Sequence, residues 1–405
     1  MGRLPLPRRT PRHAWPHPLH LLPHAHRTHH RPRPPTLLPP PLEPHGKTEN
    51  LPLDRRPKFP PRIRGVRPPR RRPALPHRHR TRWLARRPRR SRRERPRMSS
   101  PAAKPLLSVV VTVVDGGDVL RRFLRALTTQ EDPPAMEILV PFDSSKASVA
   151  QVCAEFPTVT PIPMGDVPTF RPISTAAGQH EMFDRQRVAG LNRAIGELIA
   201  ILEDRAPPRP NWVRTAVRLH REHPYGVIGG AIEPAPQRLL NWSFYVCDFT
   251  RYGLPFESEP RAWISDINVC YKRAMMDSTR DIWRERFNEA KVHWTLAERG
   301  ETLFLSNELI VDYHTPYQSV AQVLPERFGW GRLYGSVLAT SVSPLRRLIL
   351  IALAPLIPLR LLLRHGIAHA RRGNLAKYLK ATPIIAAYLL FWTAGETWGN
   401  ITGKP

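Results

Sequence analysis

A nearly continuous run of β-branched residues at positions 108–114 (SVVVTVV) limits the possible folds more than any other segment. This pattern is typical of a strand buried on both faces of a parallel sheet, because a strand with one face in water alternates apolar and polar residues. The apolar residues that follow, Leu120, Phe123, Leu124 and Leu127, recur at helical spacing, and residues 137–140 (EILV) are typical of a second strand. The segment therefore predicts a β-α-β unit.

The same alternation continues along the chain. We expect helices at residues 187–196 and 212–223, and strands at residues 199–202 and 226–232. Strands that alternate with helices at this spacing indicate an α/β fold with a doubly wound, mostly parallel, Rossmann-like sheet. In such sheets ligands bind beyond the carboxyl ends of the strands, so the residues that follow each strand are candidates for a site.

Residues 1–97 have a composition of their own. They contain 28 of the 63 Lys and Arg residues and 4 of the 33 Asp and Glu residues, and thus carry +24 (28 − 4) of the net charge of +30. They also contain 23 of the 48 prolines. Such a segment cannot offset the loss of chain entropy on folding, so we expect a disordered extension, with Met98 as the true start. A tail whose arginines bind nucleic acid or an anionic membrane is the alternative.

Several common site motifs are absent. The three cysteines, Cys153, Cys247 and Cys270, form no Cys-x-x-Cys pair, which predicts neither a disulfide framework nor a structural zinc site and fits a reducing compartment. Neither GxGxxG nor GxxxxGK[ST] occurs, so the sequence does not indicate a dehydrogenase or a P-loop enzyme.

Two apolar stretches near the end of the chain, residues 348–363 and 382–395, are separated by a basic segment. Each is shorter than the roughly 20 residues that a membrane-spanning helix needs, and Pro355 and Pro358 interrupt the first. If both crossed the membrane, the basic segment would lie on the disfavoured side. We therefore expect residues 321–405 to form helices that rest on the cytoplasmic face of the cell membrane. A spanning pair and a buried helical pair are the alternatives.

Glu203 and Asp204 follow the strand predicted at residues 199–202 and therefore lie at the ligand-binding edge of the sheet. Hard carboxylate oxygens at this place suit Mg²⁺ or Mn²⁺, which bind through one or two carboxylates plus substrate phosphates. Such a cation would stabilise the charge that develops on a diphosphate leaving group. On these two residues alone, a solvated acidic pair at the start of a loop is the simpler interpretation.

The flanking segments resemble the family 2 glycosyltransferases, which have the GT-A fold. Residues 108–115 resemble the family's opening strand and turn, and residues 137–145 (EILVPFDSS) its strand that ends in Asp. Residues 187–204 (RVAGLNRAIGELIAILED) are similar to the Arg-Asn-x-Gly helix that leads to the Asp-x-Asp motif. Residues 268–273 (NVCYKR) resemble the Asn-x-x-x-x-Arg segment, and residues 287–289 (FNE) the segment with the Glu-Asp pair.

For the donor, the resemblance implies a nucleotide-diphospho-sugar bound in a GT-A domain at residues 98–320. Asp143 would contact the nucleobase or ribose, and Arg187 would also lie on the donor side. Glu203 and Asp204 would face the diphosphate and its Mg²⁺ or Mn²⁺ ion, with His314 as a further metal ligand.

For the acceptor, the resemblance implies that Asn268 lies on the acceptor side and that Glu289 is the catalytic base for the acceptor hydroxyl. An inverting transfer is a single displacement, so a base far in sequence from the acidic pair is expected on physical grounds as well. The alternative for Glu289 is an exposed acid at the start of a helix, favoured by the helix dipole.

The sequence departs from the family pattern at three places. Arg205 stands where the last Asp of the Asp-x-Asp motif is usual, and this cation would either oppose metal binding or assist the diphosphate directly. Asn288 stands where the family often has Glu. Residues 326–330 (ERFGW) replace the Gln-x-x-Arg-Trp motif of processive members, which favours transfer of a single sugar.

The predicted partners are a nucleotide-sugar donor, a lipid-linked or saccharide acceptor and the membrane surface, in the synthesis of cell-envelope polysaccharide or glycolipid. Nucleic acid is not an expected partner, although the basic tail keeps a nucleic-acid or membrane-binding protein as one alternative. The other is a sugar-phosphate nucleotidyltransferase. That activity ordinarily needs a Gly-rich loop with Lys or Arg, whereas residues 115–118 (DGGD) begin and end with an acid.

Overall fold

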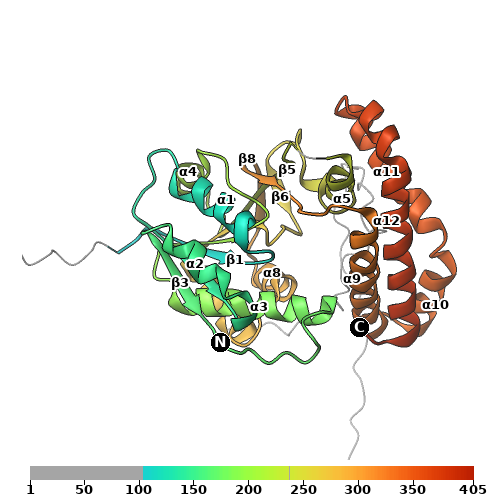
Figure 1. Cartoon of the computed structure of the whole chain (residues 1–405), viewed down its shortest axis with the longest axis horizontal. Coiled ribbons are helices and arrows are strands. Elements are labelled where there is room, and N and C mark those ends of the chain that lie inside the picture. The colour runs from blue at the N-terminus through green and yellow to red at the C-terminus, as the bar shows by residue number, and fades with distance from the viewer. Residues whose placement is uncertain (1–103, 237) are drawn as a thin grey trace, which may run out of the picture. The chain divides into compact units, whose positions relative to one another are not determined.

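An eight-stranded sheet with the strand order β3-β2-β1-β4-β7-β5-β8-β6 forms the centre of the computed structural model (Figure 1), which describes residues 104–236 and 238–405. Four neighbours are parallel: β3 (Val159–Pro163), β2 (Met136–Phe142), β1 (Leu107–Thr112) and β4 (Leu198–Glu203). β7 (Asn268–Lys272) is antiparallel to both β4 and β5 (Val227–Pro234). β5 is parallel to β8 (Leu303–Tyr313), and β6 (Glu259–Arg261) is antiparallel to β8.

The predicted mostly parallel α/β sheet is therefore confirmed. The predicted extension at residues 1–97, its suggested interaction with nucleic acid or membrane, and the start at Met98 lie outside the described residues.

β1 contributes to the apolar core on both faces of the sheet. All six of its residues are buried. Val109 and Val111 pack in the apolar cluster on one face, whereas Val110 packs in the cluster on the other. The β-branched run thus forms a strand buried on both faces, as its sequence predicts.

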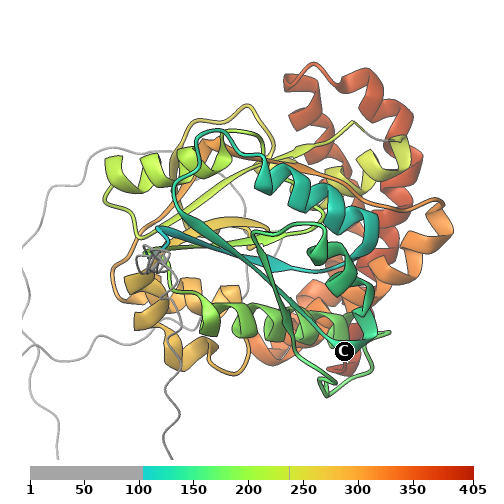
Figure 2. The same ribbon diagram turned by 60° about the vertical axis from the view of Figure 1, so that its left-hand side comes forward.

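Helices cover both faces of the sheet. Those that pack with Val109 are α1 (Gly117–Thr128), α2 (Ser148–Ala154), α4 (Trp212–Glu222) and α5 (Leu239–Phe249). Those that pack with Val110 are α3 (Ala176–Arg193), α6 (Arg273–Ser278), α7 (Arg280–Trp283) and α8 (Glu289–Glu298). α1 and α3 accordingly lie on opposite sides of the sheet (Figure 2). Two short 3-10 turns, η2 (Ser144–Lys146) and η3 (Thr250–Tyr252), complete the domain.

Four helices follow β8: α9 (Val320–Ser341), α10 (Pro344–Leu353), α11 (Leu356–Arg371) and α12 (Leu375–Thr402). α9 and α12 lie side by side (Figure 1) and meet through glycines, Gly331 and Gly335 on α9 and Gly395 and Gly399 on α12. A Cβ atom at any of the four would lie 2.0–2.2 Å from a backbone oxygen of the other helix. The two helices are therefore in backbone contact, which only glycine allows.

A buried arginine joins this helical pair to the sheet domain. Arg327 of α9 pairs with Asp248 of α5 at 2.7 Å. Its guanidinium lies 5.1 Å from the ring of Phe244 on α5 and 4.7 Å from the ring of Trp392 on α12. Burial alone would lower the pKa of Arg327, but Asp248 raises it, so the side chain stays charged. α5, α9 and α12 thus share one ion pair and its aromatic cover.

Among the described residues, no single helix has the length and apolar character to cross a bilayer. α10 and α11 together reach the length and apolar character of a membrane span, but the chain bends by 69° between the two helices.

The glycine contact yields a stability prediction. In Gly335→Ala the new methyl group would lie 2.0 Å from the carbonyl oxygen of Glu396, so α9 and α12 must separate. We expect the free energy of unfolding to fall by about 1–3 kcal/mol, measured by urea denaturation. Gly329→Ala is the matched control on the same helix, because its methyl group meets only the Cβ of Ala176 at 3.4 Å. Equal effects of the two substitutions would contradict the backbone contact.

Candidate active site

Asp204 ties together the carboxyl ends of β4 and β1. Its side chain is fully buried. Oδ1 accepts the backbone N–H of Val114 at 3.0 Å, and Oδ2 accepts those of Asp115 at 3.2 Å and Gly116 at 2.8 Å. Burial raises the pKa of Asp204 to about 6, helped by Asp115 and opposed by the N–H groups of Gly116 and Val114. The carboxylate therefore shapes the turn between β1 and α1, where Gly116 has a φ of 74° that favours glycine.

Arg205 lies beside this turn. Its Nε and Nη2 donate to the two carboxylate oxygens of Asp115 at 2.7 and 2.8 Å, and Nη1 donates to the hydroxyl of Tyr317 at 3.3 Å. The guanidinium lies 5.4 Å from the centre of the Tyr317 ring. Burial lowers the pKa of Arg205, but the hydrogen bonds to Asp115 raise it well above its usual value. A permanent cation therefore lies at the ligand-binding edge of the sheet.

Glu203 is the last residue of β4 and is buried. Burial raises its pKa to about 8, against the lowering effects of Arg205 and Arg187. Burial therefore favours the protonated form of this side chain, which can donate a hydrogen bond.

Asp143 lies at the end of β2, also at this edge. Its Oδ1 accepts the backbone N–H of Ser145 at 2.8 Å and also the Ser145 hydroxyl, so the carboxylate caps η2. The same 3-10 turn carries Lys146, whose Nζ donates to the carbonyl oxygen of Val114. Asp143 thus holds in place a loop that brings a second cation to the β1–α1 turn.

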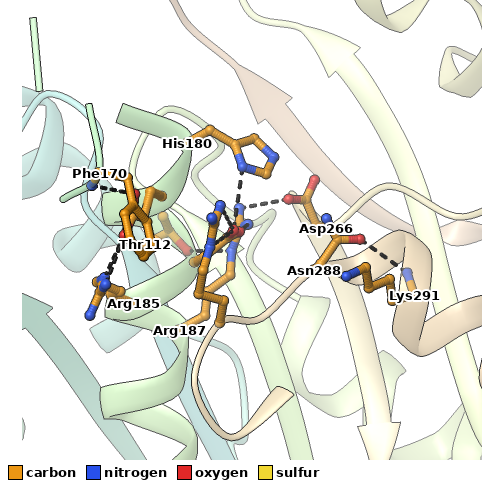
Figure 3. A network of polar contacts seen from close by, with 11 residues as sticks. Thr112, Phe170, His180, Arg185, Arg187, Asp266, Asn288 and Lys291 are labelled. Atoms are coloured by element: carbon orange, nitrogen blue, oxygen red, sulfur yellow. Dashed lines mark hydrogen bonds and ion pairs between the residues drawn. The ribbon is translucent and has the colours of Figure 1, made fainter. Parts of the chain in front are cut away.

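A second group of charged residues surrounds Arg187 of α3 (Figure 3). Its Nη2 lies 2.6 Å from Oδ2 of Asp266, its Nη1 lies 3.7 Å from Oδ1 of Asp184, and its Nε donates to Oγ1 of Thr112 at 3.2 Å. Burial would lower the pKa of Arg187, and Asp266 and Glu289 raise it. One buried guanidinium thus balances several carboxylates.

Glu289 begins α8, directly after Asn288, whose side chain caps the helix by accepting the N–H of Lys291 (Figure 3). Its Oε2 is buried and has no hydrogen-bond partner within the described part of the chain. Burial raises the pKa of Glu289 to about 7, with Asp266 in the same direction and His180 and Arg187 in the opposite one. The geometry therefore provides a carboxylate with a free oxygen that titrates near neutral pH.

His180 brings α3 and α9 together at this site. Its Nδ1 lies 3.3 Å from Oδ2 of Asp184 (Figure 3), an oxygen that also accepts Nη2 of Arg286 at 2.9 Å. Its ring meets the ring of Trp330 of α9 edge-on, with the centroids 5.8 Å apart. Burial lowers the pKa of His180 but Asp184 raises it, for a net increase. An aromatic side chain from the C-terminal helices therefore lies next to the charged group.

Sequence reasoning missed Asp184, His180 and Asp266. His180, Asp184 and Arg187 are spaced four and three residues apart and so share one face of α3, a pattern that is visible in the sequence. No comparable pattern marks Asp266, which follows β6 in a loop.

One of the predicted residues, Asn268, is part of the sheet core. Asn268, predicted on the acceptor side, has no exposed surface. Its Nδ2 donates to the carbonyl oxygens of Ala231 and Leu309 at 2.9 Å each, and its Oδ1 accepts Nε1 of Trp212 at 2.9 Å. Asn268 therefore holds β5, β7 and β8 together, with no polar atom directed at an acceptor. His314 lies beside the acidic pair, since its backbone N–H donates to the carbonyl oxygen of Arg205 at 2.7 Å. Burial and then Arg122 lower the pKa of its ring.

The predicted metal ligands do not form a ligand group. Over residues 104–236 and 238–405, no three His, Cys, Asp or Glu side chains are placed to hold a metal ion. Both oxygens of Asp204 already accept backbone N–H groups, and Arg205 places a positive charge beside them. These residues do not fit a divalent cation well, since a neighbouring cation opposes its binding.

The role of Asp204 in the turn can be tested. In Asp204→Asn the amide NH₂ group would face backbone N–H groups, and the charge-assisted hydrogen bonds would be lost. We expect the free energy of unfolding to fall by about 2–3 kcal/mol, measured by urea denaturation. Asp118→Asn is the control, since Asp118 is exposed in the first turn of α1 and should leave the free energy of unfolding nearly unchanged. A stable Asp204→Asn variant would contradict the structural role.

Comparisons with known proteins bear on the whole arrangement. A comparison with curated proteins finds no match. Among solved structures, the chain is similar to a mannosyltransferase from Pyrobaculum calidifontis in complex with GDP-Man and Mn²⁺, at 12% identity, covering 73% of this chain and 88% of that chain with a TM-score of 0.43. It is also similar to S. aureus TarS 1–349 in complex with UDP-GlcNAc, at 14% identity, covering 68% of this chain and 90% of that chain with a TM-score of 0.38.

The family comparison covers the edge of the sheet that carries Asp143, Arg187, Glu203 and Asp204. Residues 108–276 match the family model described as glycosyl transferase family 2. Glu289 and the C-terminal helices lie beyond the matched residues. The chain is therefore a glycosyltransferase with a family 2 domain that reaches from β1 into α6.

Proposed function

We propose that this glycosyltransferase moves one sugar from a nucleotide-diphospho-sugar to an acceptor hydroxyl with inversion at the sugar carbon. The observation that carries the proposal is the buried Oε2 of Glu289, which has no hydrogen-bond partner among residues 104–236 and 238–405. A buried polar atom without a partner costs free energy, so its presence in a charged site points to a ligand that supplies the missing hydrogen bond. An acceptor hydroxyl is such a ligand.

In the proposed reaction Glu289 is the base. The acceptor oxygen attacks the anomeric carbon while the bond from that carbon to the diphosphate breaks, and Glu289 takes the hydroxyl proton as the new bond forms. A base with a pKa of about 7 suits this task, because it is available at neutral pH and still binds a proton well. The electron pair of the broken bond leaves with the nucleoside diphosphate.

The donor is proposed to bind at the carboxyl ends of β1, β2 and β4. Support comes from the position of Asp143, Glu203 and Asp204 at the ends of two of these strands, where ligands bind in α/β sheets. Arg187 links this edge to Glu289 electrostatically, because Glu203 at the edge and Glu289 both raise its pKa. The charge of Arg205 beside Asp204 opposes a divalent cation there. A cation bound at Glu203 and Asp204 would offset the charge of the diphosphate.

The acceptor is proposed to be lipid-linked or a saccharide, used at the cytoplasmic face of the membrane in cell-envelope synthesis. α10 and α11 support this, because they expose an apolar stripe at helical spacing: Leu345, Leu348, Ile349, Leu353, Leu356, Leu359, Leu363 and Ile367. Exposed basic residues follow the stripe, among them Arg371 and Lys380. An apolar face beside basic residues suits an anionic lipid surface.

The base assignment predicts a loss of turnover in Glu289→Gln. The variant keeps the size of the side chain but cannot accept the proton, so we expect nucleoside diphosphate release to fall about 10²- to 10⁴-fold with donor affinity nearly unchanged. Release is measured over a panel of UDP, GDP and dTDP sugars with lipid and saccharide acceptors. In the native enzyme, turnover should rise as the pH passes through about 7, because Glu289 is then deprotonated.

The groups that set this pH range are Asp266, His180, Arg187 and Asp184. Glu285→Gln is the matched control, since Glu285 is an exposed acid four residues earlier and should leave turnover unchanged. A Glu289→Gln enzyme that turns over normally, or one that loses donor affinity instead, would argue against the base role.

The membrane assignment predicts binding of the full chain to vesicles that contain phosphatidylserine. Leu348→Gln/Leu359→Gln should weaken this binding about tenfold or more, because both exposed side chains would leave the lipid. High salt is used in the flotation assay, since it screens attraction by the basic residues 1–97 but not apolar insertion. Ile195→Gln, at an exposed position on the sheet domain, is the control. Equal binding of all three proteins would refute the membrane contact through α10 and α11.

A further inference from the structure

The edge of the sheet proposed to receive the diphosphate has two fixed cations. Arg205 lies beside the β1–α1 turn, held by Asp115 through two hydrogen bonds of 2.7 and 2.8 Å. Lys146 reaches the same turn from η2 and donates to the carbonyl oxygen of Val114. α1 begins at Gly117 immediately after the turn, so the positive end of its dipole lies there too.

Two acidic residues at this edge, Asp204 and Asp115, are already engaged. Asp204 accepts three backbone N–H groups, and Asp115 accepts two N–H groups of Arg205. A divalent cation would have to approach a permanent guanidinium to reach Asp204, and like charges at such distances repel.

We propose that Arg205 takes the place of a divalent cation at the donor diphosphate, so that a nucleoside diphosphate binds without metal. This inference rests on the proposed function and deepens it at the donor side. Three of the five N–H donors of the guanidinium are engaged by Asp115 and Tyr317, which leaves two for phosphate oxygens. Asp115 and the Tyr317 ring fix the guanidinium plane, so little side-chain entropy is lost when the anion binds.

Arg205 in this role offsets the charge that leaves with the diphosphate. The guanidinium remains protonated throughout, so it changes no bond and transfers no proton. It acts as a permanent charge placed before the reaction, which is the property that makes such groups effective at a developing anion.

The test is a calorimetric titration of the full chain with UDP, GDP, ADP, CDP and dTDP separately, in excess EDTA and in excess Mn²⁺. The nucleoside diphosphate that binds should have the same dissociation constant in excess EDTA and in excess Mn²⁺. Arg205→Ala should weaken it about 10- to 100-fold, as expected for the loss of charge-assisted hydrogen bonds. Arg209→Ala is the matched control, because Arg209, in the loop after β4, pairs with Asp312 of β8 and should leave the dissociation constant unchanged when replaced.

A second variant separates a direct role of Arg205 from one in which it merely holds the turn. Asp115→Asn removes the negative charge but leaves an amide oxygen that can still accept one N–H of Arg205 and hold the guanidinium in place, so binding should stay equal or become tighter if Arg205 meets the diphosphate. If Arg205 acts only as a brace, Asp115→Asn should weaken binding as Arg205→Ala does, and the inference is overturned.

Dependence on Mn²⁺ distinguishes the remaining outcomes. Binding that appears only with Mn²⁺, and that Arg205→Ala leaves intact, would overturn the inference while the proposed transfer reaction stands. Failure of every nucleoside diphosphate to bind in either condition would overturn the proposed function and, with it, this inference.

Discussion

The hydrogen bonds from the β1–α1 turn to Asp204 are the interaction on which the rest of the site depends. A fully buried carboxylate is costly, and three backbone N–H groups offset that cost only if the turn keeps one conformation. That conformation sets where α1 begins and where Asp115 points. Asp115 in turn orients Arg205. The acidic residue at the end of β4 is thus first a structural anchor, and the charged edge is built around it.

A second constraint is that several carboxylates share the buried guanidinium of Arg187. Asp266, Glu289, Asp184 and Glu203 all act on Arg187, so no single carboxylate receives its full stabilisation. Burial, and after it Asp266, raise the pKa of Glu289 to about 7, and its Oε2 has no hydrogen-bond partner among the described residues. A site with one acid fewer would hold Glu289 ionised more firmly, and proton uptake by the base would be weaker.

The sequence allowed prediction of the features that depend on local pattern. The buried run in β1 and the acidic pair at the end of β4 are of this kind. It did not reveal the first half of α3, because that helix buries Glu181, Asp184 and Gln186 in place of apolar residues. Nor could it show that Asp204 binds a turn 90 residues earlier, since the donors are backbone N–H groups, which leave no trace in residue type. The role of Asn268 could not be predicted for the same reason, because two of its three partners are backbone carbonyl groups.

The glycine contact between α9 and α12 links the apolar stripe to the charged site. At one end, Trp330 of α9 contacts His180 of the charged site. At the other end, α12 packs on α11, which carries part of the apolar stripe. Backbone atoms in direct contact cannot slide by changing side-chain rotamers, because no side chain lies between them. If α10 and α11 rest on a lipid surface as proposed, Glu289 is held at a fixed height above it. A lipid-linked acceptor would then need a hydroxyl at that height, and the length of its head group would decide whether it reaches the base.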